Sequence, residues 1–165
     1  MIQQFSSLEG TISSVFPLQG SGSAPCSMAM TLETGDGQTV YIRIDGSTYV
    51  LGQTPLRQGD RITAFYDSTA PMPFIYPPQY RILVIARLEE GQTAALDYFD
   101  QNLLNSQGTL QLRLSGSTRV LLPNGQYFLG IPGGQYLLAI YTSATRSLPA
   151  QTVPQQIVVF CSPSA

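Results

Sequence analysis

The residues best suited to contact a ligand are aromatic side chains in one proline-rich stretch, residues 66–80. Four prolines share this stretch with four aromatic residues, Tyr66, Phe74, Tyr76 and Tyr80. Rings held on a stiff polyproline backbone form stacking platforms for a ligand at low entropic cost. The alternative is structural, with the same side chains folding back to cap the core under a long loop. Capping is favoured because the later proline-rich segment, residues 148–154, has no aromatic residue.

Paired carboxylates are the second group that could do chemistry, because glycosidase-like hydrolysis needs only two acids. Asp45, Asp60 and Asp67 fall at the ends of expected strands. Asp45 and Asp60 stand in turn sequences, where aspartate is common because it hydrogen-bonds to its own backbone. We therefore interpret these acids as turn residues. A small hydrolase built on carboxylates remains the alternative function.

The composition excludes most other catalysis. The chain has no histidine and no tryptophan, and all eight basic residues are arginine. Ser-His and Cys-His catalysis, histidine-ligated zinc or haem, Schiff-base chemistry and a P-loop lysine each need a side chain that is missing. We therefore expect no enzyme, no cofactor and no metal site.

Charge and cysteine content set further expectations. A net charge of −2 with 11% charged residues creates no field that would gather nucleic acid or an anionic membrane. The longest apolar runs are too short to cross a bilayer, and the N-terminus lacks a signal-peptide pattern, so we expect a soluble chain. Cys26 and Cys161 could form a single bridge; otherwise Cys161 is expected to pack as a small hydrophobe.

An internal repeat organises the chain. Ile42–Leu51 aligns with Leu112–Leu121 at an offset of 70, with six of ten residues identical. Gly59–Ser68 then aligns with Gly134–Ser143 at an offset of 75, which indicates a five-residue insertion between the two matches. Pro78-Gln79 is aligned with Pro154-Gln155. The repeat predicts two units, residues 1–90 and 91–165, with Gly46 equivalent to Gly116 and Tyr66 equivalent to Tyr141.

The elements that must position these residues are β-strands. Apolar and polar residues alternate with period two in both units, turn residues separate the runs, and helix signals are nearly absent. The first unit predicts five strands, at about residues 9–18, 28–33, 40–44, 61–66 and 80–88. Residues 89–104 are interpreted as a linker followed by a strand from about residue 97. The fold class is therefore all-β.

The order of the first five strands resembles the oligonucleotide/oligosaccharide-binding fold, a small Greek-key barrel. The resemblance covers residues 8–88 and includes the turn at Gly59-Asp60 that opens the fourth strand. It implies that the loop after the fourth strand lines a ligand groove. The second unit has room for only one strand before its third, so we expect an incomplete barrel. Because its strand at residues 136–141 is apolar on both faces, we expect it to pack on the first unit or on another copy of the chain.

The whole chain is also similar to uncharacterised proteins of clostridia and related bacteria, in which segments such as Gly59–Tyr66 and Ala144–Gln151 recur. That resemblance implies no activity, substrate or site residue. We therefore expect a non-catalytic binding or adaptor module for a peptide, a glycan or a protein partner, with a homo-oligomer as one arrangement. Nucleic acid and membrane are not expected as partners.

Overall fold

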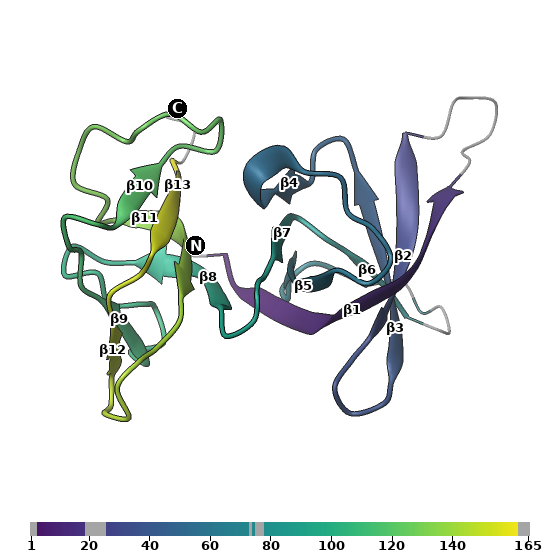
Figure 1. Ribbon diagram of the computed structural model, residues 1–165, viewed down its shortest axis with the longest axis horizontal. Coiled ribbons are helices and arrows are strands. Elements are labelled where there is room, and N and C mark those ends of the chain that lie inside the picture. The colour runs from purple at the N-terminus through teal and green to yellow at the C-terminus, as the bar shows by residue number, and fades with distance from the viewer. Residues whose placement is uncertain (1–2, 19–25, 73, 75–77, 162–165) are drawn as a thin grey trace. The chain divides into compact units, whose positions relative to one another are not determined.

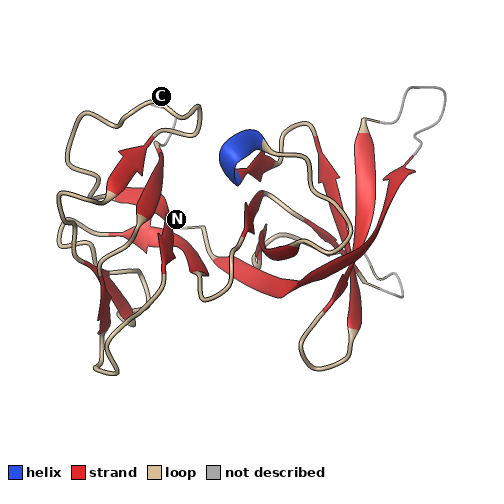
Figure 2. Cartoon of the chain, viewed as in Figure 1, coloured by secondary structure: helices blue, strands red, loops and turns tan. Residues whose placement is uncertain are grey.

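The computed structural model describes residues 3–18, 26–72, 74 and 78–161. It divides into an N-terminal unit, Gln4–Glu89, and a C-terminal unit, Glu90–Ala165 together with Met1–Gln3. Nearly all regular structure is β-strand, as Figure 2 shows, and within the described residues the helical structure is a single short 3₁₀ turn, η1 (Leu51–Gln53). The all-β class predicted from the sequence is confirmed.

The N-terminal unit is one seven-stranded sheet, which Figure 1 shows curling around its own core. Its strands are β1 (Phe5–Leu18), β2 (Ser27–Glu33), β3 (Thr39–Asp45), β4 (Tyr49–Val50), β5 (Arg61–Asp67), β6 (Gln79–Arg81) and β7 (Val84–Arg87). They are ordered β4-β7-β5-β1-β2-β3-β6. The long strand β1 pairs with β5 through Thr11 and with β2 from Thr11 onward, so one strand serves both halves of the sheet.

The core of this unit follows from the alternation of apolar residues along its strands. One face of the sheet supplies a buried aliphatic cluster that comes from all the long strands. Its members are Ile12, Met30, Leu32, Ile42, Ile44, Ile62, Ala64, Ile82 and Ile85. Residues between these positions, such as Arg43, therefore face outward.

The closed barrel predicted from the sequence is not formed by strand pairing, because the sheet ends at β4 and β6. The predicted single strand at residues 80–88 is split into β6 and β7, since the chain changes partner between them. The Ile82 N–H donates to the Arg43 carbonyl in β3 at 3.0 Å, whereas the Leu83 N–H donates to the Phe65 carbonyl in β5 at 2.9 Å. Two adjacent residues thus bond to strands in opposite halves of the sheet.

The C-terminal unit has a four-stranded sheet and a separate two-stranded one. Its strands are β8 (Thr93–Phe99), β9 (Leu110–Leu112), β10 (Arg119–Leu121), β11 (Gln135–Tyr141), β12 (Ala150–Thr152) and β13 (Gln156–Phe160). The sheets have the orders β10-β13-β11-β8 and β12-β9. The strand expected from about residue 97 instead begins at Thr93, because Ala94, Ala95 and Leu96 pair with β11.

The two units have matching strand orders, and equivalent hydrogen bonds form within each unit. The order β10-β13-β11-β8 matches β4-β7-β5-β1, and the parallel pair β9–β12 matches β3–β6. The Thr48 hydroxyl donates to the Ile82 carbonyl at 3.0 Å, and the Thr118 hydroxyl donates to the Pro154 carbonyl at 2.8 Å. Each threonine also closes a turn, which contains Gly46 in one unit and Gly116 in the other.

These bonds change one part of the sequence alignment. Pro154 takes the position of Ile82, between the last two strands of its unit, and Pro78 instead lies just before β6. Aligning Pro78-Gln79 with Pro154-Gln155 was therefore wrong by several residues, because two Pro-Gln pairs had matched by chance. Cys161 is also corrected: it lies exposed just after β13, and both Cys26 and Cys161 are free thiols.

Candidate functional site

The most unusual feature on the outer face of the N-terminal sheet is a pair of neighbouring arginines. Arg43 in β3 is the register partner of Arg81 in β6, and both side chains are exposed. Like charges directly opposite each other on neighbouring strands destabilise a sheet. Among the described residues no carboxylate lies within salt-bridge distance of Arg43 or Arg81, although the charges of both act on the Asp45 carboxylate.

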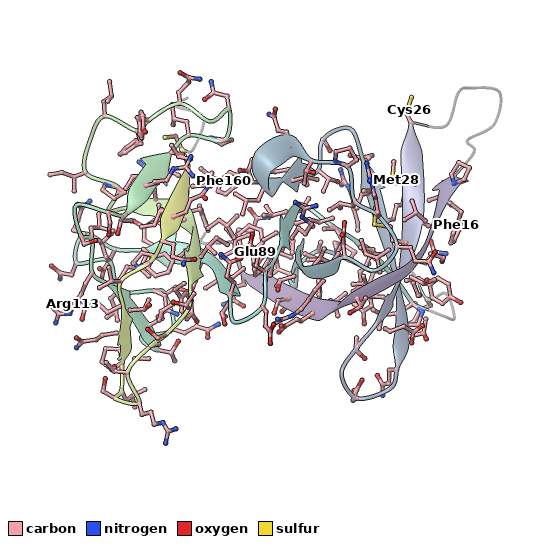
Figure 3. The ribbon with its side chains drawn as sticks, in the orientation of Figure 1. Phe16, Cys26, Met28, Glu89, Arg113 and Phe160 are labelled. Carbon is pink, nitrogen blue, oxygen red and sulfur yellow. The ribbon has the colours of Figure 1, made fainter. Side chains whose placement is uncertain are left out.

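Apolar and aromatic side chains extend this arginine pair into a row across four strands. Register partners share a face of the sheet, and Phe16 in β1 pairs with Ala29 in β2, which in turn pairs with Arg43. Phe16 is 40% exposed, whereas Ala29 is buried between its neighbours. Figure 3 places Phe16 near the C-terminal end of β1. The outer face thus presents an aromatic ring and two cations along one line, which we call the Phe16–Arg81 row.

The sequence-predicted aromatic residues do not form one site. The rings of Tyr66 and Tyr80 meet at a centroid distance of 4.9 Å and an angle of 51°, and both pack against the core cluster. This packing corresponds to the structural alternative, in which the aromatic side chains fold back and cap the core. Phe74 is fully exposed, and Tyr76 lies outside the described residues. Of the four, Phe74 is thus the described residue whose ring is free to contact a ligand.

A shallow pocket of about 370 Å³ occupies the corresponding place in the C-terminal unit. It is lined by Arg113, Ser143, Ala144, Thr145, Gln151, Thr152 and Val153. Arg113, directly after β9, is aligned with Arg43 of β3 in the sequence repeat. Its side chain lies at the surface in Figure 3. Its Nε donates to the Gln151 Oε1 at 2.7 Å.

The hydrogen bonds around this pocket hold its wall in place. The Gln151 N–H donates to the Thr145 hydroxyl at 2.9 Å, and the Thr152 hydroxyl donates to the Ser143 carbonyl at 2.5 Å. The guanidinium of Arg113 keeps N–H groups beyond the Nε bond. The described residues that line the pocket include no carboxylate. Each unit therefore places an arginine that forms no salt bridge, among the described residues, at its parallel strand pair, β3–β6 in one unit and β9–β12 in the other.

The candidate acids serve turns, as the sequence predicted. Asp45 Oδ1 accepts from the Ser47 N–H at 2.8 Å, Asp60 Oδ2 from the Arg57 N–H at 2.9 Å and Asp67 Oδ1 from the Thr69 N–H at 2.9 Å. Among the described residues, no three or more acids or cysteines gather as a metal site would require.

The pKa of Asp45 is affected by the two arginines of the Phe16–Arg81 row. The Ser47 hydroxyl and N–H, which both donate to Oδ1, lower the pKa of Asp45, and the charges of Arg81 and Arg43 lower it further. A group whose native pKa is lowered stabilises the fold above its unfolded pKa, near 3.8, and loses that contribution as the pH falls through the native pKa.

We predict that Ser47→Ala raises the native pKa of Asp45 toward 3.8, because it removes the strongest hydrogen bond to the carboxylate. The pKa can be followed by NMR titration of the side-chain carboxyl carbon. Arg43→Gln with Arg81→Gln should raise it less, and added salt should reproduce only the arginine effect. An Asp45 pKa unchanged in Ser47→Ala would contradict this assignment of causes.

Sequence reasoning missed Arg43 and Arg81 as a pair. Alternation could place Arg43 on the outer face, but the parallel pairing of β6 with β3 joins residues almost forty positions apart. Only the expectation of a barrel, in which the third and last strands of the unit come together, could have suggested that pairing.

Compared with known proteins, the sequence matches no family model and no curated sequence. The resemblance to clostridial proteins therefore stays a prediction. In the part of the chain that the structure describes, helices with the length and hydropathy of a membrane span are absent.

Proposed function

We propose that this chain is a non-catalytic binding module in which each unit by itself recognises an acidic peptide segment, the N-terminal unit through Arg43 and Arg81 and the C-terminal unit through the Arg113 pocket. The observation that carries the proposal is the pair of adjacent arginines, which share only the more distant Asp45 carboxylate and form no salt bridge among the described residues. Such a pair costs stability in the free protein. A bound carboxylate would remove the repulsion and form charge-assisted hydrogen bonds with both guanidinium groups.

The strand connections support an oligonucleotide/oligosaccharide-binding-like design for both units. In the N-terminal unit β1, β2 and β3 form a meander, β5 returns to β1, and the β6–β7 segment contacts both β3 and β5. In the C-terminal unit β11 pairs with β8 and β13, and β12 pairs with β9, whereas among the described residues no strand takes the place of β2. We propose that the units arose by duplication and that the outer face of β3 and β6 is the ligand face.

The ligand class follows from the side chains of the Phe16–Arg81 row. Two cations suit one or two carboxylates, whereas a net charge of −2 over the chain opposes a long polyanion. Phe16 and the fully exposed Phe74 offer rings to apolar or aromatic side chains of the ligand. A peptide in which acidic and apolar residues alternate would match both features of the row.

The proposal can be tested by fluorescence anisotropy with a labelled six-residue peptide of alternating glutamate and phenylalanine. A matched glutamine–phenylalanine peptide removes the charge and keeps the rings. We expect Arg43→Gln with Arg81→Gln to weaken binding of the glutamate peptide by about tenfold or more, because charge-assisted hydrogen bonds are lost.

Arg57→Gln with Arg87→Gln is the matched control, because both arginines are exposed and their loss removes the same two charges. It should leave the affinity within about twofold, as expected for distant exposed charges. Equal binding of the two peptides, or no effect of Arg43→Gln with Arg81→Gln, would contradict the proposal. Selective binding of an acidic oligosaccharide instead would keep the arginine site and overturn the peptide as its ligand.

A further inference from the structure

Three of the four most exposed large apolar side chains described in the C-terminal unit gather in the loop between β10 and β11. Leu129 is 95% exposed, Ile131 82% and Tyr127 68%. Large apolar side chains scattered singly over a surface are ordinary, whereas three within five residues form a patch. We call these three residues the apolar tip.

The loop that carries the apolar tip is anchored at both ends. At its start the Leu122 N–H donates to the Gln126 carbonyl at 2.7 Å and the Phe128 N–H to the Val120 carbonyl at 2.9 Å. The Phe128 ring packs against the core cluster of this unit. At its end a Cβ on Gly133 would lie 2.9 Å from the Gln101 Cα, so the loop backbone is pressed against the end of β8. The apolar tip is therefore presented on a held loop, with Phe128 turned inward between exposed neighbours.

The corresponding connection of the N-terminal unit lacks such a tip. Residues 51–60, between β4 and β5, include no exposed large apolar side chain. The alignment offset rises from 70 to 75 within this connection, so the extra residues of the C-terminal unit lie in the loop that bears the tip. The apolar tip is thus an addition to the β10–β11 connection, because the N-terminal unit makes the equivalent β4–β5 connection without it.

Charge and area indicate what the tip contacts. Residues 120–145 contain no charged side chain, so nothing in this segment needs a counter-charge or resists leaving water. Three such side chains offer on the order of 400 Å², about half of what each partner buries in a stable protein interface. A lipid surface requires no complementary shape and accepts a small convex group.

From these observations we propose that the apolar tip, Tyr127, Leu129 and Ile131, inserts reversibly into the interfacial layer of a lipid bilayer. Leu129 and Ile131 would enter the acyl boundary, and the amphipathic ring of Tyr127 would lie at the headgroups. The sequence expectation of no membrane partner rested on the lack of basic charge and of a spanning segment. Neither feature is needed by a neutral tip. This inference does not depend on the arginine site.

The absence of tryptophan from the chain gives a direct test. In Leu129→Trp the new residue is the only tryptophan, and its emission should shift to the blue with phosphatidylcholine vesicles at about 1 mM lipid, the range of weak reversible anchors. Brominated phosphatidylcholine should quench it. Adding Ile131→Ser should weaken binding by about tenfold or more, because a fully transferred isoleucine side chain is lost.

Leu148→Trp is the matched control, because Leu148 is 84% exposed on a different loop of the same unit. Its emission should not change with vesicles. An unshifted emission for Leu129→Trp, or equal shifts for both variants, would overturn the proposal. A blue shift that appears without lipid and follows dimer formation in light scattering would also overturn it, and would assign the tip to a second copy of the chain.

Discussion

Replacing Leu138 by alanine is expected to lower the free energy of unfolding by about 2–5 kcal/mol, the range for deleting a buried leucine side chain. Leu138 lies in the middle of β11 and is fully buried. Its register partners are Leu96 in β8 and Val158 in β13, which are also buried. The alanine variant would leave a cavity in this apolar row, in addition to losing the transfer free energy of the side chain.

Leu129→Ala is the matched control for this measurement, because the same substitution at a 95% exposed position removes almost no buried contact. Urea unfolding followed by far-ultraviolet circular dichroism should show a lower midpoint for Leu138→Ala and an unchanged one for Leu129→Ala. A cost below about 1 kcal/mol for Leu138→Ala would mean that this face of β11 is not tightly packed. The burial of both faces, which the alternation of residues 136–141 predicted, would then be wrong.

Local alternation predicted most of the strands. The segments that became β2 and β3 each bury one set of side chains in the core cluster and largely turn the other outward. β5 was also found from its alternation, although it buries Thr63 and Phe65 as well as Ile62 and Ala64. β8 was placed several residues late, since Ala94, Ala95 and Leu96 follow no clear period. Their strand conformation comes from pairing with β11, which a local pattern does not contain.

The point at which the chain changes from one partner strand to another could not be predicted from the sequence, for the same reason. Residues 82–86 form an unbroken apolar run that gives no sign of a break, yet the chain leaves β3 at Ile82 and joins β5 at Leu83. The register that sets Arg81 opposite Arg43 depends on that exchange. The aromatic residues, which are conspicuous in the sequence, were the weaker guide, because Tyr66 and Tyr80 are part of the core.

The insertion in the second unit could be located from the sequence, although the exposure of its side chains could not. Tyr127, Phe128, Leu129 and Ile131 are all apolar or aromatic, so composition alone suggests that they are buried together. The structure buries only part of Phe128, because the hairpin turn after β10 and the contact of Gly133 with Gln101 fix which side chain points inward.

The last prediction concerns Gly10, where β1 passes from pairing with β5 to pairing with β2. A Cβ at Gly10 would lie 2.6 Å from the Glu33 carbonyl oxygen and 3.1 Å from the Glu33 carbonyl carbon. Both are backbone atoms at the end of β2, and they cannot move aside as the end of a flexible side chain can. Gly10→Ala should therefore lower the free energy of unfolding by about 1–3 kcal/mol, the usual cost of overpacking a closely packed site.

Gly35→Ala provides the control, because a Cβ at Gly35, in the turn two residues after Glu33, would meet nothing within 4 Å. It should change stability by less than about 0.5 kcal/mol, as most surface substitutions do. The two variants can be compared by urea unfolding under identical conditions. If Gly10→Ala unfolded at the same urea concentration as Gly35→Ala, the close approach of β2 to β1 at this point would be refuted. A lower midpoint for Gly10→Ala alone would show that glycine is needed where one strand serves both halves of the sheet.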